Sequence, residues 1–497
     1  MERSVPVSQL LAALPGARVV GTLPAIVTAI ADDSRKVERG GCFVAVPGLR
    51  EDARRFVPEA VRRGAVLVVT EGGPLPGVAV PQVLVPSARE ALGRLADVYF
   101  GHPSGRLTVV GITGTNGKTT TSYLVEALLH ARGLKPGVIG TIQYRIGDRI
   151  LPAGQTTPDA LALHAMLAAM YESGVRGVSM EVSSHALAQA RVDAVTFDVG
   201  VFTNLTQDHL DFHGTLDEYR RAKRRLFELL ERSPKPRRAA VVNADDPSGA
   251  EMVRGLSVPA LTFGLRSGAA VHARDWSSTL DGIRLSAMTP VGPVELASPL
   301  IGEHNVMNLL GAIGVGIALG LPSGTIARAL AGVGTVPGRF EQVREGQPFL
   351  VVVDYAHTPD ALERVLATAR KLTRGRLGVV FGCGGDRDRG KRPLMGEIAA
   401  RLADRAWVTS DNPRSEPPEA IIDEVLAGVR RVAGATGRAE READRRAAIE
   451  AALGWAQPGD TVVIAGKGHE TYQIVGRDTL PFDDRDVART VLRARRG

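Results

Sequence analysis

The stretch with the clearest chemistry is GITGTNGKTT, residues 111–120, where glycine, lysine and threonine crowd a short turn. It lies between an apolar, strand-like run and a helix-like segment. Backbone N–H groups in such a turn, together with the positive end of the following helix, bind phosphate oxygens. We therefore expect Lys118 to reach the terminal phosphates of a nucleotide and Thr119 or Thr120 to ligate Mg²⁺.

The turn departs from the strict pattern G-x-x-x-x-G-K-[ST], which would place glycine at position 112. That position is Ile112, and the glycines fall at 111 and 114 instead. An ordinary strand–turn–helix is the alternative interpretation. The combination of Gly114, Gly117, Lys118 and Thr119 favours a phosphate site over that alternative.

Groups that suit a metal end two other strand-like runs. Glu181 closes the apolar run GVSME, where a carboxylate is costly unless it is paired or metal-bound. The segment 202–214, FTNLTQDHLDFHG, adds Asp208, His209 and Asp211. A solvent-exposed Glu181 and a His209 that only makes structural hydrogen bonds remain alternatives at this point.

Several classes of nucleotide protein fit the sequence poorly. The guanine-reading pattern N-K-x-D of regulatory GTPases is missing from the sequence. The segment GCGGDRDRG, 382–390, follows a strand-like run but lacks the G-x-G-x-x-G spacing of dinucleotide-binding dehydrogenases. A P-loop regulatory or nucleic-acid-binding ATPase is suggested only by the basic composition.

The composition is that of a globular protein of several domains. The chain has 497 residues, 44% hydrophobic residues and a formal net charge of +7, and its length predicts about two to four domains. Its arginines alternate with acidic residues and alanine, as on solvated helix faces, so a small anionic substrate explains the charge as well as nucleic acid would. We expect no nucleic-acid partner.

The sequence also favours a cytoplasmic protein. Its two cysteines, Cys42 and Cys383, give neither a disulfide framework nor a zinc-binding spacing. The N-terminus lacks a basic start followed by a long apolar core, so no secretion signal is predicted. The most apolar stretch, 307–321, is short and contains four glycines, which predicts a buried helix and no membrane span.

The elements that must position these residues form an α/β protein. We expect three domains, 1–104, 105–336 and 337–497, with boundaries near GHPSGR and GVGTVPGRF. Short apolar runs alternate with helical segments, which predicts parallel sheets with right-handed crossovers and ligands at the carboxyl ends of the strands. The expected strands are 42–46, 65–69, 83–85, 107–112, 138–142, 177–182, 199–203, 239–243, 349–354, 377–381, 406–409 and 461–465.

Seven segments resemble, in the same order along the chain, the motifs of the Mur ligases of peptidoglycan synthesis. They are GTNGKTT, EVSSH, TNLTQDHLDFHG, EHNVMN, GRFE, DYAHTPDAL and GCGGDRDRGKRPLMG. The resemblance implies a small N-terminal α/β uridine-binding domain, a central P-loop ATPase-type domain with a parallel sheet and a C-terminal Rossmann-like domain that binds the amino acid. The implied reaction transfers the γ-phosphoryl group of ATP to a substrate carboxylate, and an amine then displaces phosphate from the acyl phosphate.

Two further segments, DSRKVERGGCFVAVPG and SDNPRSEP, narrow the resemblance. They are similar to the subgroup that adds meso-2,6-diaminopimelate to UDP-N-acetylmuramoyl-L-alanyl-D-glutamate. The lysine-adding counterpart and a folylpolyglutamate-synthase-like ligase are the alternatives. The resemblance implies small-molecule substrates only, and we expect a monomer.

The resemblance assigns residues to ATP and to two Mg²⁺ ions. It implies ATP contacts by Gly114, Thr115, Asn116, Gly117, Lys118, Thr119, Thr120, Asn305, Arg339 and Asp354. It implies catalytic roles for Lys118, Glu181, His209 and Lys223, and metal ligation by Thr119, Glu181, His209 and Lys223. Lys223, which by itself reads as one more helix-surface cation, matches the family's carbamylated lysine (N6-carboxylysine). A CO₂-derived carbamate would turn this cation into a carboxylate-like metal ligand.

The resemblance assigns the two other substrates as well. Contacts to the UDP-linked dipeptide would come from Ser34, Leu49, Arg50, Glu51, Gln155, Thr156, Thr157, Ser183, Gln189 and Arg191, with Asp33 and Arg35 beside Ser34. Contacts to diaminopimelate would come from Arg387, Asp411, Asn412, Pro413, Arg414, Gly466 and Glu470. Arg414 can clasp the distal carboxylate that lysine lacks, although a turn cation after Pro413 is the alternative.

Overall fold

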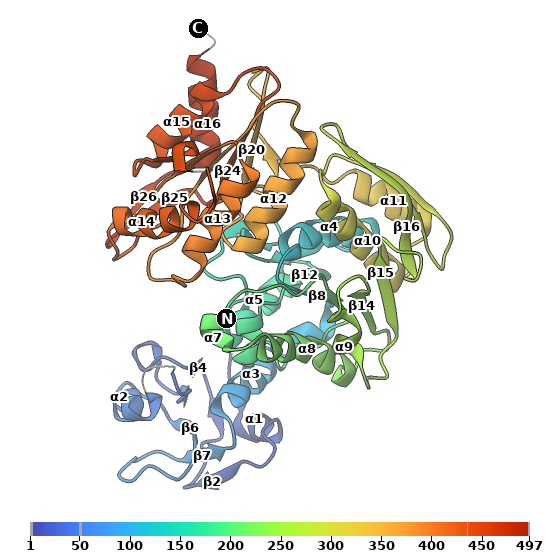
Figure 1. Ribbon diagram of the computed structural model, residues 1–497. Helices are drawn as coiled ribbons and strands as arrows, with labels where there is room; N and C mark the ends of the chain where they lie inside the picture. The colour runs from blue at the N-terminus through green and yellow to red at the C-terminus, as the bar shows by residue number, and fades with distance from the viewer. Residues whose placement is uncertain (1–2, 49–51, 435, 496–497) are drawn as a thin grey trace.

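A computed structural model describes residues 3–48, 52–434 and 436–495. Figure 1 shows three lobes that follow one another along the chain, and each contains one main sheet. The sheets have five, eleven and six strands, and helices cover them. The fold is therefore α/β, as the sequence predicts.

The N-terminal lobe holds the five-stranded sheet, in the order β2-β7-β6-β5-β4. The strands are β2 (Arg18–Val20), β7 (Gln82–Val85), β6 (Leu67–Glu71), β5 (Cys42–Val44) and β4 (Ile30–Ala31), and a separate pair joins β1 (Val5–Pro6) to β3 (Ile26–Val27). The helices are α1 (Val7–Ala12), α2 (Val57–Arg62) and α3 (Ala88–Tyr99). Strands β4 to β7 pair in parallel, whereas β2 pairs antiparallel with β7.

The central lobe is built on the eleven-stranded sheet. Its parallel part consists of β9 (Pro136–Ile139), β12 (Gly177–Glu181), β8 (Thr108–Thr113), β13 (Val199–Phe202), β14 (Ala239–Asn243) and β15 (Ala260–Gly264). Antiparallel strands extend it at both edges: β10 (Gln143–Ile146), β11 (Arg149–Pro152), β17 (Gly282–Met288) and β18 (Val294–Ser298), while β16 (Val271–Thr279) pairs parallel with β15 and antiparallel with β17. The sheet is therefore mixed, because strands at 143–152 and 271–298, which were not predicted, continue it beyond the parallel part.

Helices cover both faces of this sheet. They are α4 (Lys118–Ala131), α5 (Ala160–Glu172), α6 (Ser184–Ala188), α7 (Leu210–His213), α8 (Leu216–Arg232), α9 (Gly249–Val253), α10 (Glu303–Ala318) and α11 (Ser323–Ala331). Successive side chains of a strand point to opposite faces: Val110 and Ile112 pack with α4, α10 and α11, whereas Val109 packs with α5 and α8. The apolar stretch 307–321 lies largely in the buried helix α10, as expected.

The C-terminal lobe has the sheet order β19-β20-β24-β21-β22-β23. The strands are β19 (Glu341–Gln342), β20 (Leu350–Asp354), β24 (Thr461–Ala465), β21 (Leu377–Phe381), β22 (Arg405–Val408) and β23 (Ala439–Arg441), and all but β19 pair in parallel. The helices are α12 (Pro359–Leu372), α13 (Lys391–Leu402), α14 (Pro418–Val429), α15 (Arg445–Trp455) and α16 (Asp484–Ala494). A separate hairpin joins β25 (Tyr472–Val475) to β26 (Asp478–Pro481).

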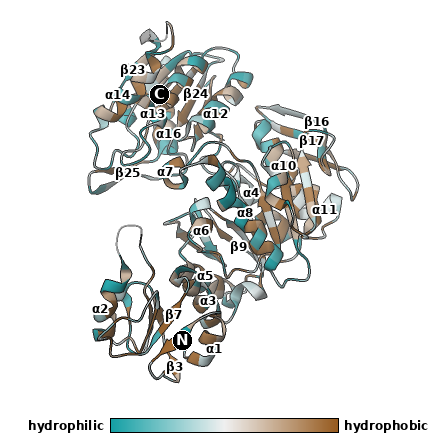
Figure 2. Ribbon diagram, turned by 60° about the horizontal axis from the view of Figure 1, so that its bottom comes forward, coloured by the Kyte–Doolittle hydropathy of each residue, from teal (hydrophilic) through white to brown (hydrophobic). Residues whose placement is uncertain are grey.

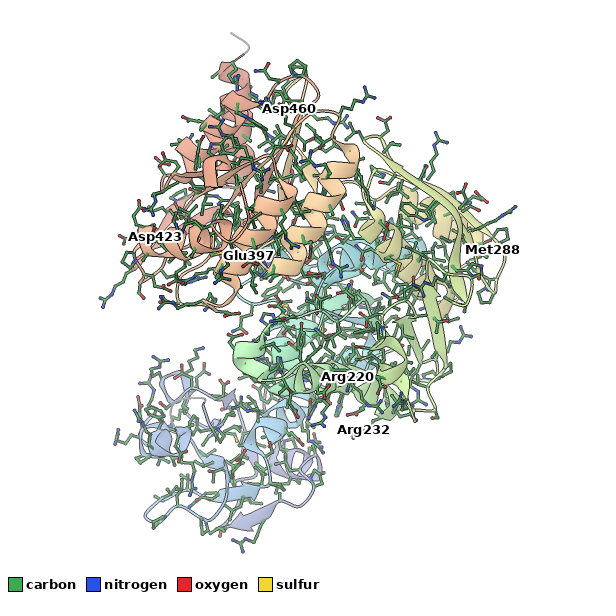
Figure 3. The ribbon with its side chains drawn as sticks, viewed as in Figure 1. Arg220, Arg232, Met288, Glu397, Asp423 and Asp460 are labelled. Carbon is green, nitrogen blue, oxygen red and sulfur yellow. The ribbon has the colours of Figure 1, made fainter. Side chains whose placement is uncertain are left out.

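Hydrophobic colouring follows the inner strands, and hydrophilic colouring marks much of the outer helices and loops (Figure 2). The charged run on α8 fits this pattern: Arg220, at the surface in Figure 3, pairs with Asp217 at 3.1 Å, and Arg224 pairs with Glu228 at 3.2 Å. Lys223 on the same helix is the exception, because only 1% of it is exposed. This exception places Lys223 in the interior, next to the candidate site.

Candidate active site

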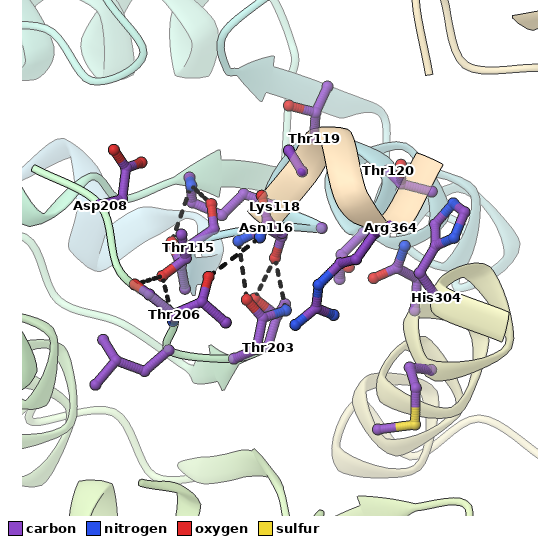
Figure 4. A pocket seen from close by; sticks show the side chains of 18 of the residues that line it. Thr115, Asn116, Lys118, Thr119, Thr120, Thr203, Thr206, Asp208, His304 and Arg364 are labelled. Carbon is purple, nitrogen blue, oxygen red and sulfur yellow. Dashed lines mark hydrogen bonds between the residues drawn. The ribbon is translucent and has the colours of Figure 1, made fainter. Parts of the chain in front are cut away.

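The loop between β8 and α4 closes around a cavity of about 660 Å³ (Figure 4). Parallel strands on both sides bring the loop and the segments after β12 and β13 to one edge of the sheet. Gly114 and Gly117 have φ values of +150° and +85°, and a Cβ at Gly114 would collide with the hydroxyl of Thr203. Glycine is therefore required where the chain bends toward the cavity.

The ammonium of Lys118 folds back over this loop. It donates to the carbonyl oxygens of Gly114 at 2.9 Å and Thr115 at 2.7 Å. Burial lowers the pKa of Lys118, while the charges of Glu181 and Asp208 oppose the shift. No carboxylate in the described part of the chain forms an ion pair with this lysine. Its charge is held at the cavity wall by backbone oxygens alone, a position from which it can pair with an anionic ligand.

Thr119 and Glu181, predicted as metal ligands, lie side by side. The Thr119 hydroxyl donates to Glu181 Oε2 over 3.2 Å, and Glu181 is 1% exposed. The backbone N–H and the hydroxyl of Thr141 each donate to the same carboxylate over 2.9 Å. These oxygen donors line the cavity and are of the kind that Mg²⁺ prefers.

A second group of candidates lines the same cavity beyond the phosphate loop. His209, with φ of +54°, lies 3.3 Å from Asp208, and burial lowers its pKa to about 4. The Lys223 ammonium lies 4.2 Å from the ring centroid of Tyr219, and burial lowers its pKa well below the ordinary value. Within the described residues this ammonium makes no hydrogen bond or ion pair, so it is a buried amine without a polar partner.

These side chains alone do not complete two metal sites. Among the described residues, no group of three or more His, Cys, Asp or Glu side chains is arranged to hold a metal ion. The oxygens of Thr119 and Glu181 fit one Mg²⁺ ion. A carbamate on Lys223 would add oxygen ligands beside His209, and the unpartnered, buried amine fits that modification.

Candidate nucleotide contacts come from the central and the C-terminal lobe. Arg339 donates to the Thr119 hydroxyl over 2.9 Å and stacks on Tyr355, and Asp354 accepts hydrogen bonds from the backbone N–H groups of Phe340 and Ala356. Both Arg339 and Asp354 line the cavity. The cavity is therefore closed by two lobes of the chain.

Asn305 lies behind the cavity wall. Its amide nitrogen donates to the Ile301 carbonyl over 2.8 Å, and its oxygen accepts from Asn308 over 2.9 Å. Asn308 lines the cavity whereas Asn305 does not. The structure thus gives Asn305 the position of a support for Asn308.

The residues expected to hold the sugar–peptide form a network next to Glu181. Arg191 donates to the carbonyl of Thr157 at 3.0 Å and to Gln189 at 2.8 Å, and it also contacts Gln155. The Thr157 hydroxyl donates to the Glu181 carbonyl at 2.9 Å. This network also includes Thr156 and Ser183, which line the cavity.

Ser34 lies apart from this network, in the N-terminal lobe. Its hydroxyl donates to Glu59 over 2.8 Å, and Asp33 pairs with Arg35. Leu49, Arg50 and Glu51 lie outside the described residues. The N-terminal lobe is joined to the central lobe by α3 against α5 and by Arg225, which contacts both Glu90 and Asp193.

The residues expected to bind the amino acid gather at the carboxyl ends of β21, β22 and β24, outside the cavity lining. Asn412 donates to Glu470 over 2.9 Å, and Arg414, with φ of +52°, donates to the Gly385 carbonyl over 2.8 Å. Pro413 stands between them, and its carbonyl would collide with a Cβ at Gly385. Arg387 is exposed, and Asp411 and Gly466 pack against each other.

Several residues of these sites were not predicted. Thr141, Asp360 and Lys467 each contact a predicted residue from a distant part of the sequence, and Asn308 contacts Asn305 on the same helix. Asn308 stands in the quoted motif EHNVMN, three positions after Asn305, so helical spacing could have identified it. Thr141 was expected inside the strand 138–142, whereas β9 ends at Ile139, so the sequence held no signal for its role.

Family models match the central and C-terminal lobes of the chain. Residues 112–316 match the family model described as Mur ligase middle domain, and residues 338–468 match the one described as Mur ligase, glutamate ligase domain. A UDP-N-acetylmuramoyl-L-alanyl-D-glutamate–2,6-diaminopimelate ligase of Geobacillus thermodenitrificans is 49% identical over 493 residues, covering 98% of this chain and 99% of the relative.

Solved structures resemble the chain as well. A structure of a UDP-N-acetylmuramoyl-L-alanyl-D-glutamate–2,6-diaminopimelate ligase matches with a TM-score of 0.68 at 35% identity, covering 95% of this chain and 96% of the other. The MurF ligase from Thermotoga maritima in complex with ADP matches with a TM-score of 0.62 at 22% identity, covering 94% and 98% of the two chains, which shows likeness of fold alone. In residues 3–48, 52–434 and 436–495, none of the helices is both long and apolar enough to cross a membrane.

Proposed function

The chain belongs to the Mur ligase family, and from this we propose that it adds meso-2,6-diaminopimelate to UDP-N-acetylmuramoyl-L-alanyl-D-glutamate in peptidoglycan precursor synthesis. It is an ATP-dependent ligase that forms a C–N bond. The observation that carries the proposal is that Lys118, Thr119, Glu181, His209 and Lys223 line one cavity, which the C-terminal lobe closes. The nearly full-length similarity to diaminopimelate-adding ligases supports the choice of substrates.

The chemistry follows from the charges at the cavity. A carboxylate is a poor electrophile at neutral pH, and it repels the triphosphate of ATP. Lys118 and the N–H groups of residues 114–117 would hold the terminal phosphates, and they would stabilise the charge that develops as the γ-phosphoryl group moves. A carboxylate oxygen of the dipeptide then bonds to the γ-phosphorus, and the bond to ADP breaks.

The second half-reaction forms the amide. The amine of the incoming amino acid attacks the carbonyl carbon of the acyl phosphate, and inorganic phosphate leaves with the former carboxylate oxygen. We propose that Arg387, Asp411, Asn412, Arg414 and Glu470 bind the amino acid that carries this amine. Gly466 and Pro413 shape the same loops.

Mg²⁺ is the metal that fits the donors, and it would supply positive charge against the phosphates. We propose that Thr119 and Glu181 hold one ion, and that His209 and a carbamate on Lys223 hold a second. Burial lowers the pKa of Lys223, which favours the neutral amine, the form that reacts with CO₂. The other expected ATP contacts, Asn116, Thr120, Arg339 and Asp354, complete the nucleotide site, with Asn305 supporting Asn308.

We propose the same division of labour among the lobes as the sequence predicts. Residues 1–104 would bind the uridine end through Ser34 and the segment 49–51, residues 105–336 would bind ATP, and residues 337–497 would bind the amino acid. The sugar–peptide would contact Gln155, Thr156, Thr157, Ser183, Gln189 and Arg191. We propose that the protein acts as a monomer in the cytoplasm.

The lysine-adding counterpart is the second candidate. Diaminopimelate carries a distal carboxylate that a guanidinium can clasp with two hydrogen bonds, whereas lysine would place an ammonium against it. Arg414 therefore favours diaminopimelate. A folylpolyglutamate-synthase-like activity is less favoured, because the chain is similar over nearly its whole length to a ligase that acts on a UDP-linked substrate.

The test is phosphate release from ATP with each combination of substrates. We expect turnover that requires both the UDP-linked dipeptide and meso-diaminopimelate, with little turnover on L-lysine. Arg414→Ala should lose diaminopimelate use far more than ATP affinity. Equal use of lysine and diaminopimelate by the wild-type enzyme would contradict the assignment.

An isotope experiment tests the mechanism separately. When the carboxylate oxygens of the dipeptide carry ¹⁸O, one label should appear in the released phosphate for each amide formed. Unlabelled phosphate during steady product formation would exclude the acyl phosphate route.

A further inference from the structure

Lys467 lies at the centre of the loop that follows β24, between Gly466 and Gly468. Its side chain is 0% exposed, although lysine is rarely fully buried without a partner. The two glycines have φ values of +117° and +52°, and a Cβ at Gly466 would lie 2.5 Å from a carboxylate oxygen of Asp411. This tight backbone directs the lysine inward, under the cluster expected to bind the amino acid.

The Lys467 ammonium joins two residues of that cluster. It donates to Asn412 Oδ1 over 3.1 Å and to Glu470 Oε2 over 3.2 Å, and it lies 4.0 Å from Asp411. Asn412 in turn donates to the same Glu470 oxygen over 2.9 Å and accepts from the N–H of Ile474 over 3.0 Å. These contacts fix the orientation of the Asn412 amide, because its oxygen accepts from two donors and its nitrogen donates to Glu470.

The contacts leave one Glu470 oxygen available. Lys467 and Asn412 both use Oε2, and Oε1 accepts no hydrogen bond from the described residues. Burial and the charge of Asp411 raise the pKa of Glu470, and Lys467 opposes both effects. The other titratable groups that interact with Glu470 are Arg445, Tyr355 and Tyr472.

The net charge of the cluster formed by Asp411, Glu470 and Lys467 suits the amine end of an amino acid. Two carboxylates, Asp411 and Glu470, and one lysine leave a formal charge of −1, which an incoming ammonium would neutralise. Arg387 and Arg414 lie on the neighbouring loops and suit the carboxylates of the same molecule. Without Lys467, the two carboxylates would face each other in a buried cluster. In such an environment one of two carboxylates takes up a proton.

We propose that Lys467 is a positioning residue for the incoming amino acid, which holds Glu470 and Asn412 so that Glu470 Oε1 receives the ammonium of that amino acid. This inference rests on the proposed ligase function. It adds to that function a residue that touches no substrate and acts through two residues that do.

The first test is Lys467→Met, assayed by initial rates with each substrate varied in turn. The KM for diaminopimelate should rise roughly 10- to 100-fold, because the variant weakens hydrogen bonds to a charged group. The KM values for ATP and for the UDP-linked dipeptide should stay within about twofold, since neither substrate is expected to contact this cluster. An unchanged KM for diaminopimelate would overturn the proposal.

The pH profile separates positioning from general support of the fold. In Lys467→Met the acid limb of kcat/KM for diaminopimelate should move to higher pH, because Glu470 is protonated more readily. Lys467→Arg should restore the wild-type profile. Lys371→Met on α12 is the matched control: this exposed lysine pairs with Glu303 at 3.5 Å and should alter neither KM nor the profile.

A double variant keeps the test valid if Lys467→Met folds poorly. Lys467→Met/Glu470→Gln removes both charges together, so it leaves no unpaired carboxylate at position 470. Relative to Glu470→Gln alone, it should raise the KM for diaminopimelate less than about threefold, because the lysine acts through the glutamate. A full 10- to 100-fold rise in that background would contradict the proposal. Failure of the wild-type enzyme to use diaminopimelate would instead contradict the proposed function.

Discussion

Cations that line the cavity in the central lobe and fully buried cations of the C-terminal lobe have different partners. In the central lobe, Lys118 contacts only backbone carbonyls and Lys223 lies against an aromatic ring. In the C-terminal lobe, Arg392 pairs with Glu416 at 2.8 Å, Arg445 with Asp484 at 2.7 Å and Lys467 with Glu470 at 3.2 Å. The first two cations have no carboxylate partner among the described residues, whereas each of the last three has at least one.

The difference separates Lys118 and Lys223, which line the cavity, from Arg392 and Arg445, which stabilise the fold. Lys467 stands apart, because its partner Glu470 belongs to the cluster expected to bind the amino acid. A paired buried charge is already neutralised, so its removal leaves a carboxylate alone in the interior. A lysine in the interior without a carboxylate partner destabilises the fold. Such a lysine is retained when a ligand or a covalent modification supplies the missing partner. We therefore expect substitution of Arg392 or Arg445 to cost stability, and substitution of Lys118 or Lys223 to cost activity.

The largest effect should come from Arg445→Ala. Arg445 and Asp484 are both 0% exposed, and the arginine also donates to the carbonyl of Ala465 at 3.0 Å. Removing it strands a buried carboxylate, which costs about 3–5 kcal/mol of unfolding free energy. Thermal or urea unfolding measures the loss. The neighbouring, exposed Arg446→Ala is the control, and equal stability of the two variants would contradict the comparison.

Lys118→Ala should show the reverse pattern. Phosphate release should fall about 100- to 1,000-fold, the usual cost of removing one group that stabilises charge in the transition state. The unfolding temperature should stay the same or rise, because the variant removes an ammonium whose pKa burial lowers. A variant that loses stability in proportion to activity would break the distinction between the lobes.

Lys223→Ala should lose activity at least about 10- to 100-fold, because removing even a group that only supports a metal ligand costs that much. Short-chain carboxylates should partly restore it, because they place oxygens where the carbamate would be. Depleting CO₂ should slow the wild-type enzyme and leave the variant unchanged. Wild-type turnover by Lys223→Ala would exclude the carbamate, and mass spectrometry of the native enzyme would test for it directly.

The ion pair between Arg392 and Glu416 should have a smaller effect, on the pH dependence of stability. The hydrogen bond from Arg392 lowers the pKa of Glu416 to about 2. A carboxyl whose pKa is lower in the folded than in the unfolded chain adds stability above its unfolded value, and this stability is lost as the pH falls through its folded value. Unfolding of the wild type should therefore become easier between about pH 4.5 and 2, and Glu416→Gln should weaken that dependence.

Local pattern explains what the sequence could predict. The strand–turn–helix around Lys118 and the alternation of strands and helices depend on residues close together in the chain, so the α/β fold was predictable. The strands at 271–298 were not predicted, because their mixture of polar and apolar residues suits an exposed edge as well as a loop. The fold class was therefore easier to predict from the sequence than the full extent of the sheet.

The sites show the same limit. Asn305 and Asn308 share a helix face, and only packing decides which of them reaches the cavity. Lys467 looks like an ordinary loop cation, because its partner Asn412 is 55 positions away. The assigned roles of the site residues remain predictions, although most of the assigned residues gather in two clusters.

The smallest effect should come from the contact that joins the two lobes. Asp360 on α12 accepts hydrogen bonds from Asn116 of the phosphate loop at 2.7 Å and from Thr206 at 3.0 Å. We expect this contact to orient the phosphate loop and to contribute little to the stability of either lobe alone. Asp360→Ala should lower kcat/KM for ATP roughly 2- to 10-fold, the range for one or two ordinary hydrogen bonds. Glu363→Ala, which removes a carboxylate from the same helix that pairs weakly with Arg401 at 3.5 Å, should leave kcat/KM unchanged. A loss as large as that of Lys118→Ala would mean that Asp360 itself takes part in nucleotide binding, and the two lobes would then share one charged site.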